Sequence, residues 1–332
     1  MLKIQTRTSH CVRSLFVAAL TMVSCLVLTT DRLSAQPEGS VVVPVTDEND
    51  TELPWGATLF APNPSLTDGE PLKFTKKGGV VYQQTEDYSL KCDVYTPVGD
   101  GPFPAILAVH GGGWRWGSKF MMTRHAWLMA RSGYVVVAIN YRHAPKDRFP
   151  AQIVDCQNAV RWMRNHAEEL KIDSDNIGAY GYSAGGHLVA LLGTSNGADL
   201  FARGDDSLNG DDVRVKAVVA AGAPCEFTWV GIDSPMLKFW FGDTRRNLPD
   251  LYALASPTTF ASVDDPPFYF YHGEYDYLVP QASPLRLHRK LSSIGIESSF
   301  DVVKNSDHIL PFSNLSYMKK GIQFFDRHLK ED

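Results

Sequence analysis

Residues 181–185 (GYSAG) match the G-x-S-x-G pattern that presents a serine as a nucleophile. The hydroxyl of such a serine stands clear of the backbone on a sharp turn between strand and helix. Glycines on both sides admit that turn because they carry no Cβ. The residues before Ser183 (IGAYGY) have the composition of a strand, and those after it (AGGHLVALLG) that of a helix. The pattern also arises by chance at an ordinary strand–turn–helix junction, but this context favours a nucleophile at Ser183.

A serine hydroxyl needs a base to remove its proton, and that base is commonly a histidine oriented by a carboxylate. For this kind of serine turn, the three residues follow the chain order Ser, Asp, His. Asp276 comes just after the apolar run FYFYH, and His308 comes shortly after the run SSFDVV. We therefore predict that Asp276 and His308 act with Ser183. Glu274 and Asp307 are the alternative acids.

The other histidines have simpler interpretations. His110 and His272 each open a glycine turn and are interpreted as scaffold. His187 lies within the helix that follows the serine, whereas His288 and His328 lie in amphipathic helices, where a solvated or capping role is expected. No cluster of His, Cys and Asp has the spacing of metal ligands, so the sequence predicts no metal and no cofactor.

A glycine-rich stretch, residues 110–114 (HGGGW), follows another apolar run. Consecutive glycines leave their backbone N–H groups uncovered, which suits the negative oxygen of a tetrahedral intermediate. The N–H of Ala184, directly after the serine, would act together with donors from this loop. The alternatives are a mobile glycine loop and a phosphate cradle. The lack of a GK[ST] or G-x-G-x-x-G arrangement argues against the cradle.

Strands and helices alternate from about residue 72 onward, which predicts an α/β fold with a mostly parallel, eight-stranded sheet. The strands are expected near residues 80–84, 90–95, 104–110, 134–140, 177–182, 215–221, 268–272 and 298–303. Helices are expected at 120–132, from 150, and at 184–193, 284–293 and 312–329, on both faces of the sheet. In such a sheet, reactive groups gather where the strands end, which is where Ser183, Asp276 and His308 fall.

A family resemblance rests on three of these stretches. HGGGW resembles the oxyanion loop of the hormone-sensitive-lipase-like esterases. GYSAGGHL and HGEYDYLVP are similar to bifunctional carbohydrate/feruloyl esterases and to acetyl-xylan-esterase-like proteins. The resemblance covers about residues 72–330 and implies an α/β-hydrolase fold. It also implies that the N–H groups of Gly112, Gly113 and Ala184 bind the oxyanion.

The same resemblance implies that Ser183 is the nucleophile, Asp276 the acid and His308 the base of an ester hydrolase. Two residues depart from the family pattern. Tyr182 stands where the lipase-like enzymes usually have Asp, and Asp307 precedes the histidine where glycine is frequent. The implied substrates are short-chain acyl esters, including acetyl or feruloyl esters of polysaccharides. A peptidase or amidase with the same three residues and a non-catalytic binding module are the alternatives, and the sequence does not indicate an oligomeric state.

Aromatic residues gather in two places that could contact a substrate. Trp114 and Trp116 accompany the glycine loop, and five further aromatics, Trp229 among them, fall within residues 227–241, in a small insertion after the sixth strand. We predict Trp114, Trp116 and Trp229 to bind substrate, because aromatic faces pack well on acyl and sugar groups. The alternative for the aromatics of the insertion is that they only bury a surface helix.

The first 35 residues follow the pattern of a secretory signal. Lys3, Arg7 and Arg13 precede an uncharged apolar run over residues 14–30, and Ala35 ends a small-residue cleavage site. The alternative is an uncleaved anchor, because such a run is at the lower limit for a membrane span. We predict a cleaved signal at residues 1–35, periplasmic or secreted localisation, and no stable membrane association after cleavage. Residues 36–71 are expected to form an extended arm, and residues 72–332 a single catalytic domain.

The overall composition narrows the classes of function. With 44% hydrophobic and 11% aromatic residues, this chain of 332 residues can bury a core, which excludes a disordered chain. With a formal charge of −5, the chain lacks the excess of basic residues that binds nucleic-acid phosphates, so no nucleic-acid partner is predicted. Two of the five cysteines lie in the predicted signal. Cys92, Cys156 and Cys225 allow one disulfide at most, and we interpret all three as small buried apolar groups.

Overall fold

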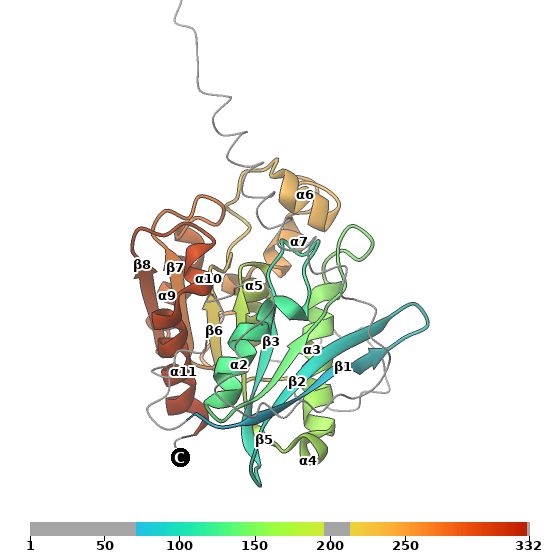
Figure 1. Ribbon diagram of the computed structural model, residues 1–332. Coiled ribbons are helices and arrows are strands. Elements are labelled where there is room, and N and C mark those ends of the chain that lie inside the picture. Colours follow the sequence, from blue (N-terminus) through green and yellow to red (C-terminus); the bar gives the residue numbers. More distant parts are fainter. Residues whose placement is uncertain (1–70, 196–212, 331–332) are drawn as a thin grey trace, which may run out of the picture. The chain divides into compact units, whose positions relative to one another are not determined.

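A computed structural model of the protein describes residues 71–195 and 213–330. The predicted signal and nearly all of the predicted arm lie outside the described residues. The described residues belong to one compact unit of the chain, in which eight strands form one sheet (Figure 1).

The strands are β1 (Phe74–Gln84), β2 (Ser89–Pro97), β3 (Phe103–Val109), β4 (Val135–Ile139), β5 (Ile172–Tyr182), β6 (Ala217–Ala221), β7 (Phe268–Gly273) and β8 (Ser298–Val303). Their order across the sheet is β1-β2-β4-β3-β5-β6-β7-β8. β2 runs antiparallel to β1 and β4, and every other neighbouring pair is parallel. The prediction of a mostly parallel, eight-stranded sheet is confirmed, and each predicted strand overlaps an observed one.

Helices cover both faces of the sheet because the central strands are apolar on both sides. In β3, Leu107 and Val109 belong to one hydrophobic cluster while Ile106 and Ala108 belong to the other, as the two-residue period of a strand requires. Side chains of α3, α5 and α9 pack in the first cluster, and those of α2 and α11 pack in the second. These helices are α2 (Thr123–Arg131), α3 (Ala151–Asn165), α5 (Ala184–Ser195), α9 (Ala282–Ser293) and α11 (Leu315–Leu329).

Shorter helices complete the described chain: η4 (Lys119–Met122), α4 (Ala167–Leu170), α6 (Pro235–Phe241), α7 (Pro249–Leu254), α8 (Pro257–Phe260) and α10 (Leu310–Ser313). Three of them, α6, α7 and α8, form the insertion between β6 and β7. Each of these three starts with a proline in its first turn, where the missing N–H costs no hydrogen bond. In Figure 1, α6 and α7 lie beyond the upper ends of the central strands.

The remaining cysteines behave as apolar side chains. Cys92, Cys156 and Cys225 are buried and form no disulfide with one another, which confirms the prediction made for them. Burial raises the pKa of the Cys92 thiol to about 12, so it stays protonated near neutral pH. Within residues 71–195 and 213–330, no helix combines the length and apolar character needed to span a membrane.

Candidate active site

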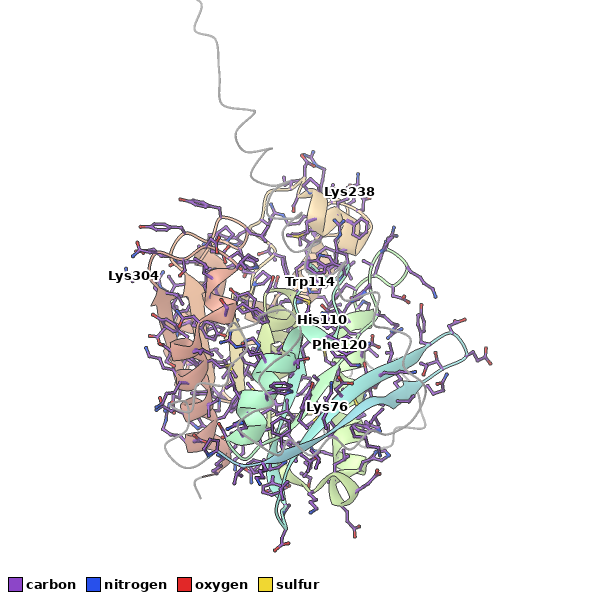
Figure 2. All side chains as sticks on the ribbon, in the orientation of Figure 1. Lys76, His110, Trp114, Phe120, Lys238 and Lys304 are labelled. Atoms are coloured by element: carbon purple, nitrogen blue, oxygen red, sulfur yellow. The ribbon has the colours of Figure 1, made fainter. Side chains whose placement is uncertain are left out.

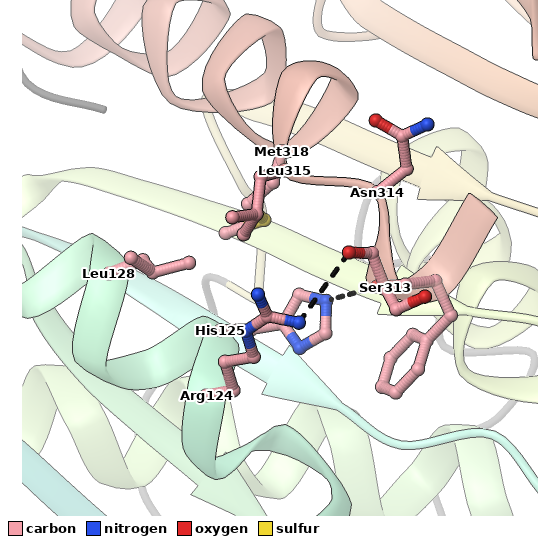
Figure 3. A pocket seen from close by; sticks show the side chains of 8 residues that line it. Arg124, His125, Leu128, Ser313, Asn314, Leu315 and Met318 are labelled. Atoms are coloured by element: carbon pink, nitrogen blue, oxygen red, sulfur yellow. Dashed lines mark hydrogen bonds between the residues drawn. The ribbon is translucent and has the colours of Figure 1, made fainter. Parts of the chain in front are cut away.

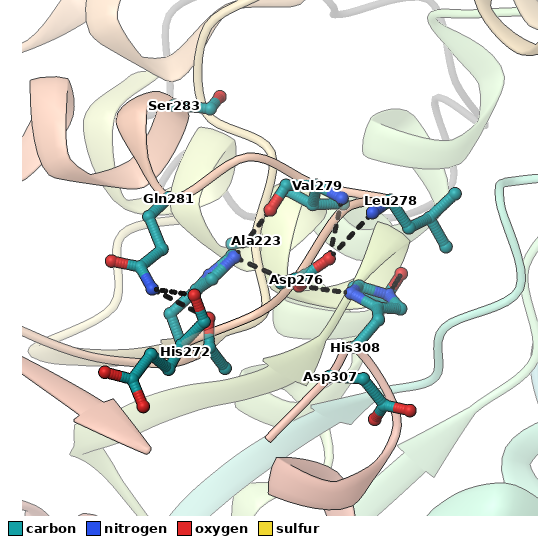
Figure 4. A network of polar contacts seen from close by, with 12 residues as sticks. Ala223, His272, Asp276, Leu278, Val279, Gln281, Ser283, Asp307 and His308 are labelled. Atoms are coloured by element: carbon teal, nitrogen blue, oxygen red, sulfur yellow. Dashed lines mark hydrogen bonds and ion pairs between the residues drawn. The ribbon is translucent and has the colours of Figure 1, made fainter. Parts of the chain in front are cut away.

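The nucleophile, acid and base that were predicted from the sequence lie together at the carboxyl ends of three parallel strands. Ser183 follows β5, Asp276 follows β7 and His308 follows β8. Nε2 of His308 lies 2.8 Å from Oγ of Ser183, and Nδ1 of His308 lies 2.6 Å from Oδ2 of Asp276. The three side chains therefore form an unbroken line of hydrogen bonds, of which Figure 4 shows the half between the acid and the base.

Ser183 occupies the strained turn that its neighbouring glycines make possible. Its φ is 56°, a left-handed conformation that L-residues rarely adopt, and its N–H donates to the carbonyl of Ala221 on β6 at 2.8 Å. A Cβ on Gly181 would lie 2.2 Å from the carbonyl oxygen of Gly185. A Cβ on Gly185 would lie 2.1 Å from the carbonyl oxygen of Val109 in β3. Side chains are thus excluded on both sides of the serine, as the pattern requires.

Tyr182, the first departure from the family pattern, holds the backbone of the histidine. Its buried hydroxyl donates to the carbonyl oxygen of His308 at 2.5 Å, and its ring lies 4.9 Å from that of Phe312 in α10. Because Tyr182 directly precedes Ser183, one residue connects the serine turn with the histidine loop.

Asp307, the second departure, lies just before the short helix α10. Its Oδ1 accepts hydrogen bonds from the N–H groups of Ile309 at 2.8 Å and Leu310 at 3.0 Å. Glu274, the other alternative acid, accepts from Lys304 and from the N–H of Asn305. Both carboxylates are engaged elsewhere, so the geometry favours Asp276 as the partner of the histidine.

Asp276 is held as an anion by four donors. Its Oδ1 accepts from the N–H groups of Leu278 at 3.1 Å and Val279 at 2.8 Å. Its Oδ2 faces His308 at 2.6 Å and Nε2 of His272 at 3.0 Å. Burial by itself raises the pKa of this carboxyl, but the hydrogen bonds from both histidines and from Val279 outweigh it and leave the pKa well below its usual range. The acid is therefore charged at neutral pH.

The glycine loop lies directly against the serine. A Cβ on Gly111 would lie 3.3 Å from Cβ of Ser183, so the loop and the nucleophile touch. Gly112 and Gly113 have φ values of 120° and 59°, which favour glycine. In the part of the chain that the structure describes, the N–H groups of Gly112, Gly113 and Ala184 donate no hydrogen bond to another protein group. They can therefore receive an oxyanion.

Two further aromatic residues set the shape of this loop. His110, which was interpreted as scaffold, stacks on Tyr141 with ring centroids 4.2 Å apart. The Tyr141 hydroxyl donates to the carbonyl of His110 at 3.0 Å. Burial lowers the pKa of His110 to about 3, so its ring stays neutral beneath the loop.

Trp114 does not line a substrate site, which corrects the sequence prediction. Its side chain is only 1% exposed and stacks on Trp240 of α6, with ring centroids 3.9 Å apart and planes within 5°. Its Nε1 donates to Nδ1 of His187 at 3.1 Å. A large ring whose N–H finds a buried partner is stable in the core, and Trp114 therefore joins the glycine loop to the insertion. Figure 2 shows Trp114 and His110 near the end of β3.

The other two predicted tryptophans are on the surface. Trp116 is 37% exposed, and its ring lies against Gly112, with Cδ2 3.4 Å from where a Cβ on that glycine would be. Trp229 is 67% exposed and stacks on the guanidinium of Arg286. Contact between either ring and a substrate stays a prediction. Phe227, Trp240 and Phe241 are buried, so the alternative stated for the aromatics of the insertion is correct for these three.

One residue beside the glycine loop was missed in the sequence. Met236 of α6 places its sulfur 3.6 Å from the position that a Cβ on Gly113 would occupy. No motif marks this methionine, because its place depends on how the insertion folds over the loop.

A small hollow lies between α2 and the helices α10 and α11 (Figure 3). Nε2 of His125 bonds the carbonyl of Phe312 there at 2.9 Å, and Arg124 reaches the carbonyl of Ser313 at 3.5 Å. These contacts anchor the segment that follows His308. The described residues contain no group of three His, Cys, Asp or Glu side chains that could hold a metal ion.

Comparisons with known proteins agree with this architecture. The sequence model of the BD-FAE family matches residues 92–291. The probable carboxylic ester hydrolase LipM of Mycobacterium tuberculosis is 34% identical over 190 residues, which are 54% of this chain and 43% of LipM. This chain spans about half the length of the curated relatives that it matches.

Solved structures show the same fold. A truncated carbohydrate esterase from gut microbiota superposes with a TM-score of 0.67 at 26% identity, covering 77% of this chain and 97% of that one. A bifunctional GH43-CE protein of Bacteroides eggerthii superposes with a TM-score of 0.68 at 31% identity, covering 76% of this chain and 38% of that one. The α/β-hydrolase fold and the resemblance to this group of esterases are confirmed.

Proposed function

Because this chain belongs to the BD-FAE family, we propose that it is a serine carboxylesterase that hydrolyses short-chain acyl esters. The observation that carries the proposal is the line of hydrogen bonds from Ser183 through His308 to Asp276, with distances of 2.8 and 2.6 Å. The relatives named as ester hydrolases support the same reaction class.

The geometry supports a separate role for each member of the triad. Asp276 is anionic and can only accept, so Nδ1 of His308 carries a proton and Nε2 is left free to take the proton of Ser183. The serine oxygen then attacks the ester carbonyl, and the protonated histidine gives its proton to the leaving alcohol. Water repeats the two steps on the acyl-enzyme and releases the acid.

The free N–H groups of Gly112, Gly113 and Ala184 are proposed to stabilise the negative oxygen that forms during each attack. Their loop contacts the nucleophile, and no protein acceptor within the described chain competes for them. Losing one such donor typically costs about 10²–10³ in rate.

The proposed substrates are acetyl or feruloyl esters of polysaccharides. Support comes from the family match and from neighbours whose names describe carbohydrate esterases. Trp116 and Met236 flank the glycine loop, and we propose that they contact the acyl or alcohol group. A peptidase activity and a non-catalytic role are outcomes that the following experiment separates.

Hydrolysis of p-nitrophenyl esters with increasing acyl length tests the reaction, and acetate and ferulate release from xylan tests the substrate. We expect Ser183→Ala to lower kcat by about 10⁵–10⁶-fold, because no other group replaces the attacking oxygen. Ser293→Ala, at an exposed position on α9, is the matched control and should leave the rate unchanged. Turnover of amides alone would favour a peptidase, and no turnover of any ester or amide would favour a binding module.

We also propose that residues 1–35 are a cleaved export signal, as their charge and apolar pattern indicate. Mass spectrometry of the protein recovered from an exporting host tests this proposal. A mature chain beginning at Gln36 is expected, and an intact chain starting at Met1 and retained in the membrane would indicate an anchor.

A further inference from the structure

His272 lies next to the acid, although the sequence suggested only a scaffold role for it. It is the penultimate residue of β7 and is 1% exposed. Its Nε2 lies 2.7 Å from the carbonyl oxygen of Val279 and 3.0 Å from Oδ2 of Asp276 (Figure 4). Two histidines therefore face one carboxylate oxygen, since His308 reaches the same Oδ2 at 2.6 Å.

The surroundings of His272 determine where its proton resides. Nε2 faces two oxygen atoms that can only accept, so it must carry the hydrogen. Nδ1 is buried and, in the part of the chain that the structure describes, has no hydrogen-bond partner. A second proton on Nδ1 would be buried without an acceptor, which is costly. The single N–H of His272 therefore has the carbonyl of Val279 and Oδ2 of Asp276 within hydrogen-bonding distance.

These contacts close a ring around the acid. The N–H of Val279 donates to Oδ1 of Asp276, while the carbonyl of the same Val279 accepts from His272. His272 thus holds the carboxylate directly through Oδ2 and indirectly through the peptide that binds Oδ1. Connected hydrogen bonds of this kind strengthen one another in a buried site.

We propose that His272 is a positioning residue that shares the charge of Asp276 and so limits how strongly the acid favours the protonated form of His308. This inference rests on the proposed esterase function, because it assigns a role within the same triad. A carboxylate that already accepts from His272 attracts the proton on His308 less strongly. The histidine is then available as a base at lower pH.

The other groups near the acid do not duplicate this role. Besides His272 on β7 and His308 after β8, Tyr182 at the end of β5 also interacts with Asp276. Burial raises the pKa of Tyr182, so it stays neutral, and its hydroxyl is used by the carbonyl of His308. Asp307 is exposed and bound to the start of α10.

Three substitutions at position 272 separate the shared hydrogen bond from simple packing. His272→Phe fills the volume without a donor. In His272→Asn, the side-chain amide ends near the position of Nδ1 and cannot reach Asp276. In His272→Gln, the side-chain amide places an N–H at the position of Nε2. His288→Phe, on α9 and away from the triad, is the control for replacing a partly buried histidine.

The acidic side of the pH profile of kcat/KM, its acid limb, reports the base of the free enzyme. We expect it to move to higher pH by about 0.5–1 unit in the Phe and Asn variants. Their kcat at neutral pH should fall by about 10-fold with KM nearly unchanged, since one hydrogen bond in the triad is lost. The Gln variant should keep the wild-type limb. If the Phe variant does not fold, the comparison of Asn with Gln decides.

An acid limb that stays in place in folded Phe and Asn variants would overturn the inference, even if their melting temperatures fall, because packing alone predicts that pattern. A wild-type protein without ester turnover would instead overturn the proposed function. The downfield proton resonance of the His308–Asp276 hydrogen bond needs no substrate. Its titration midpoint should move in the Phe and Asn variants and not in Gln, and an unmoved midpoint counts against the inference.

Discussion

Three side chains far apart in the chain depend on hydrogen bonds from their immediate neighbours. Ser183 is held at a φ of 56° by the contact between its N–H and Ala221. Asp276 is oriented by two backbone N–H groups and two histidines. The peptide of His308 is held by the hydroxyl of Tyr182. At the residue scale, separate backbone and side-chain hydrogen bonds hold each reacting group.

Tyr182→Phe tests how far the histidine loop depends on one hydroxyl. The ring keeps its packing against Phe312, but the carbonyl of His308 loses a donor. We expect kcat to fall by about 10-fold at an unchanged KM, because a small displacement of the base costs rate rather than binding. Steady-state kinetics on a p-nitrophenyl ester provides the measurement.

Tyr317→Phe is the matched control for that experiment. The Tyr317 hydroxyl also donates to a backbone carbonyl, that of Val302 at 3.3 Å near the end of β8, and not to the carbonyl of His308. The kcat of Tyr317→Phe should stay within about twofold of that of the wild type. Equal kinetics in the two variants would show that the bond to His308 does not position the base.

At the scale of elements, the insertion between β6 and β7 is joined to the glycine loop through a pair of stacked indoles. Trp114 of the loop and Trp240 of α6 are both buried, and the Nε1 of Trp240 donates to Gln152 of α3 at 3.0 Å. Met236 of the same helix lies beside Gly113. The position of α6 therefore supports the glycine loop and provides one wall next to it.

Trp240→Ala should lower stability and catalysis together. Removing a buried tryptophan costs about 3–5 kcal/mol in the free energy of unfolding, and the glycine loop loses its support. We expect a lower melting temperature and a lower kcat, measured by calorimetry and ester turnover. Trp229→Ala, in the same insertion but 67% exposed, should leave the melting temperature unchanged. If Trp240→Ala keeps the wild-type kcat, α6 does not support the loop.

Sequence patterns were sufficient to predict where the strands lie and that Ser183, Asp276 and His308 come together. They were not sufficient to predict the direction in which individual aromatic rings point. The strands were predicted because their burial produces apolar runs, and Ser183, Asp276 and His308 because each follows such a run. Trp114 was misassigned since its φ of 58° and the approach of α6 place the ring in the core, and neither is written in the local sequence. His272 was underestimated because its contacts depend on the return of the chain at Val279.

At the scale of the whole molecule, the parallel register of β5, β6, β7 and β8 brings the triad together at the carboxyl ends of these strands. Adjacent strand ends lie side by side, so residues 183, 276 and 308 meet without any local sequence signal for their contact. The site therefore depends on the sheet as a whole, and the charge state of its buried groups affects the stability of the folded protein.

Asp276 links stability to acid pH. Its pKa is lower in the folded protein than the value of about 3.9 in an unfolded chain. A group of this kind contributes stability that is present above the unfolded pKa and is lost as the pH falls toward the folded one. Between about pH 4 and pH 2, we expect the free energy of unfolding to fall more steeply in the wild type than in Asp276→Asn. Urea unfolding at several pH values measures this difference, and parallel curves would contradict it.

The most direct test of the account is covalent labelling of the protein with a fluorophosphonate, followed by mass spectrometry of its peptides. A serine activated by His308 should take up one phosphonyl group per chain at residue 183, with ester hydrolysis lost in proportion. His308→Ala should slow the labelling strongly, because the proton of the hydroxyl then has no acceptor. Labelling at another residue, or ester hydrolysis that persists in Ser183→Ala, would contradict the central claim that this hydroxyl is the nucleophile.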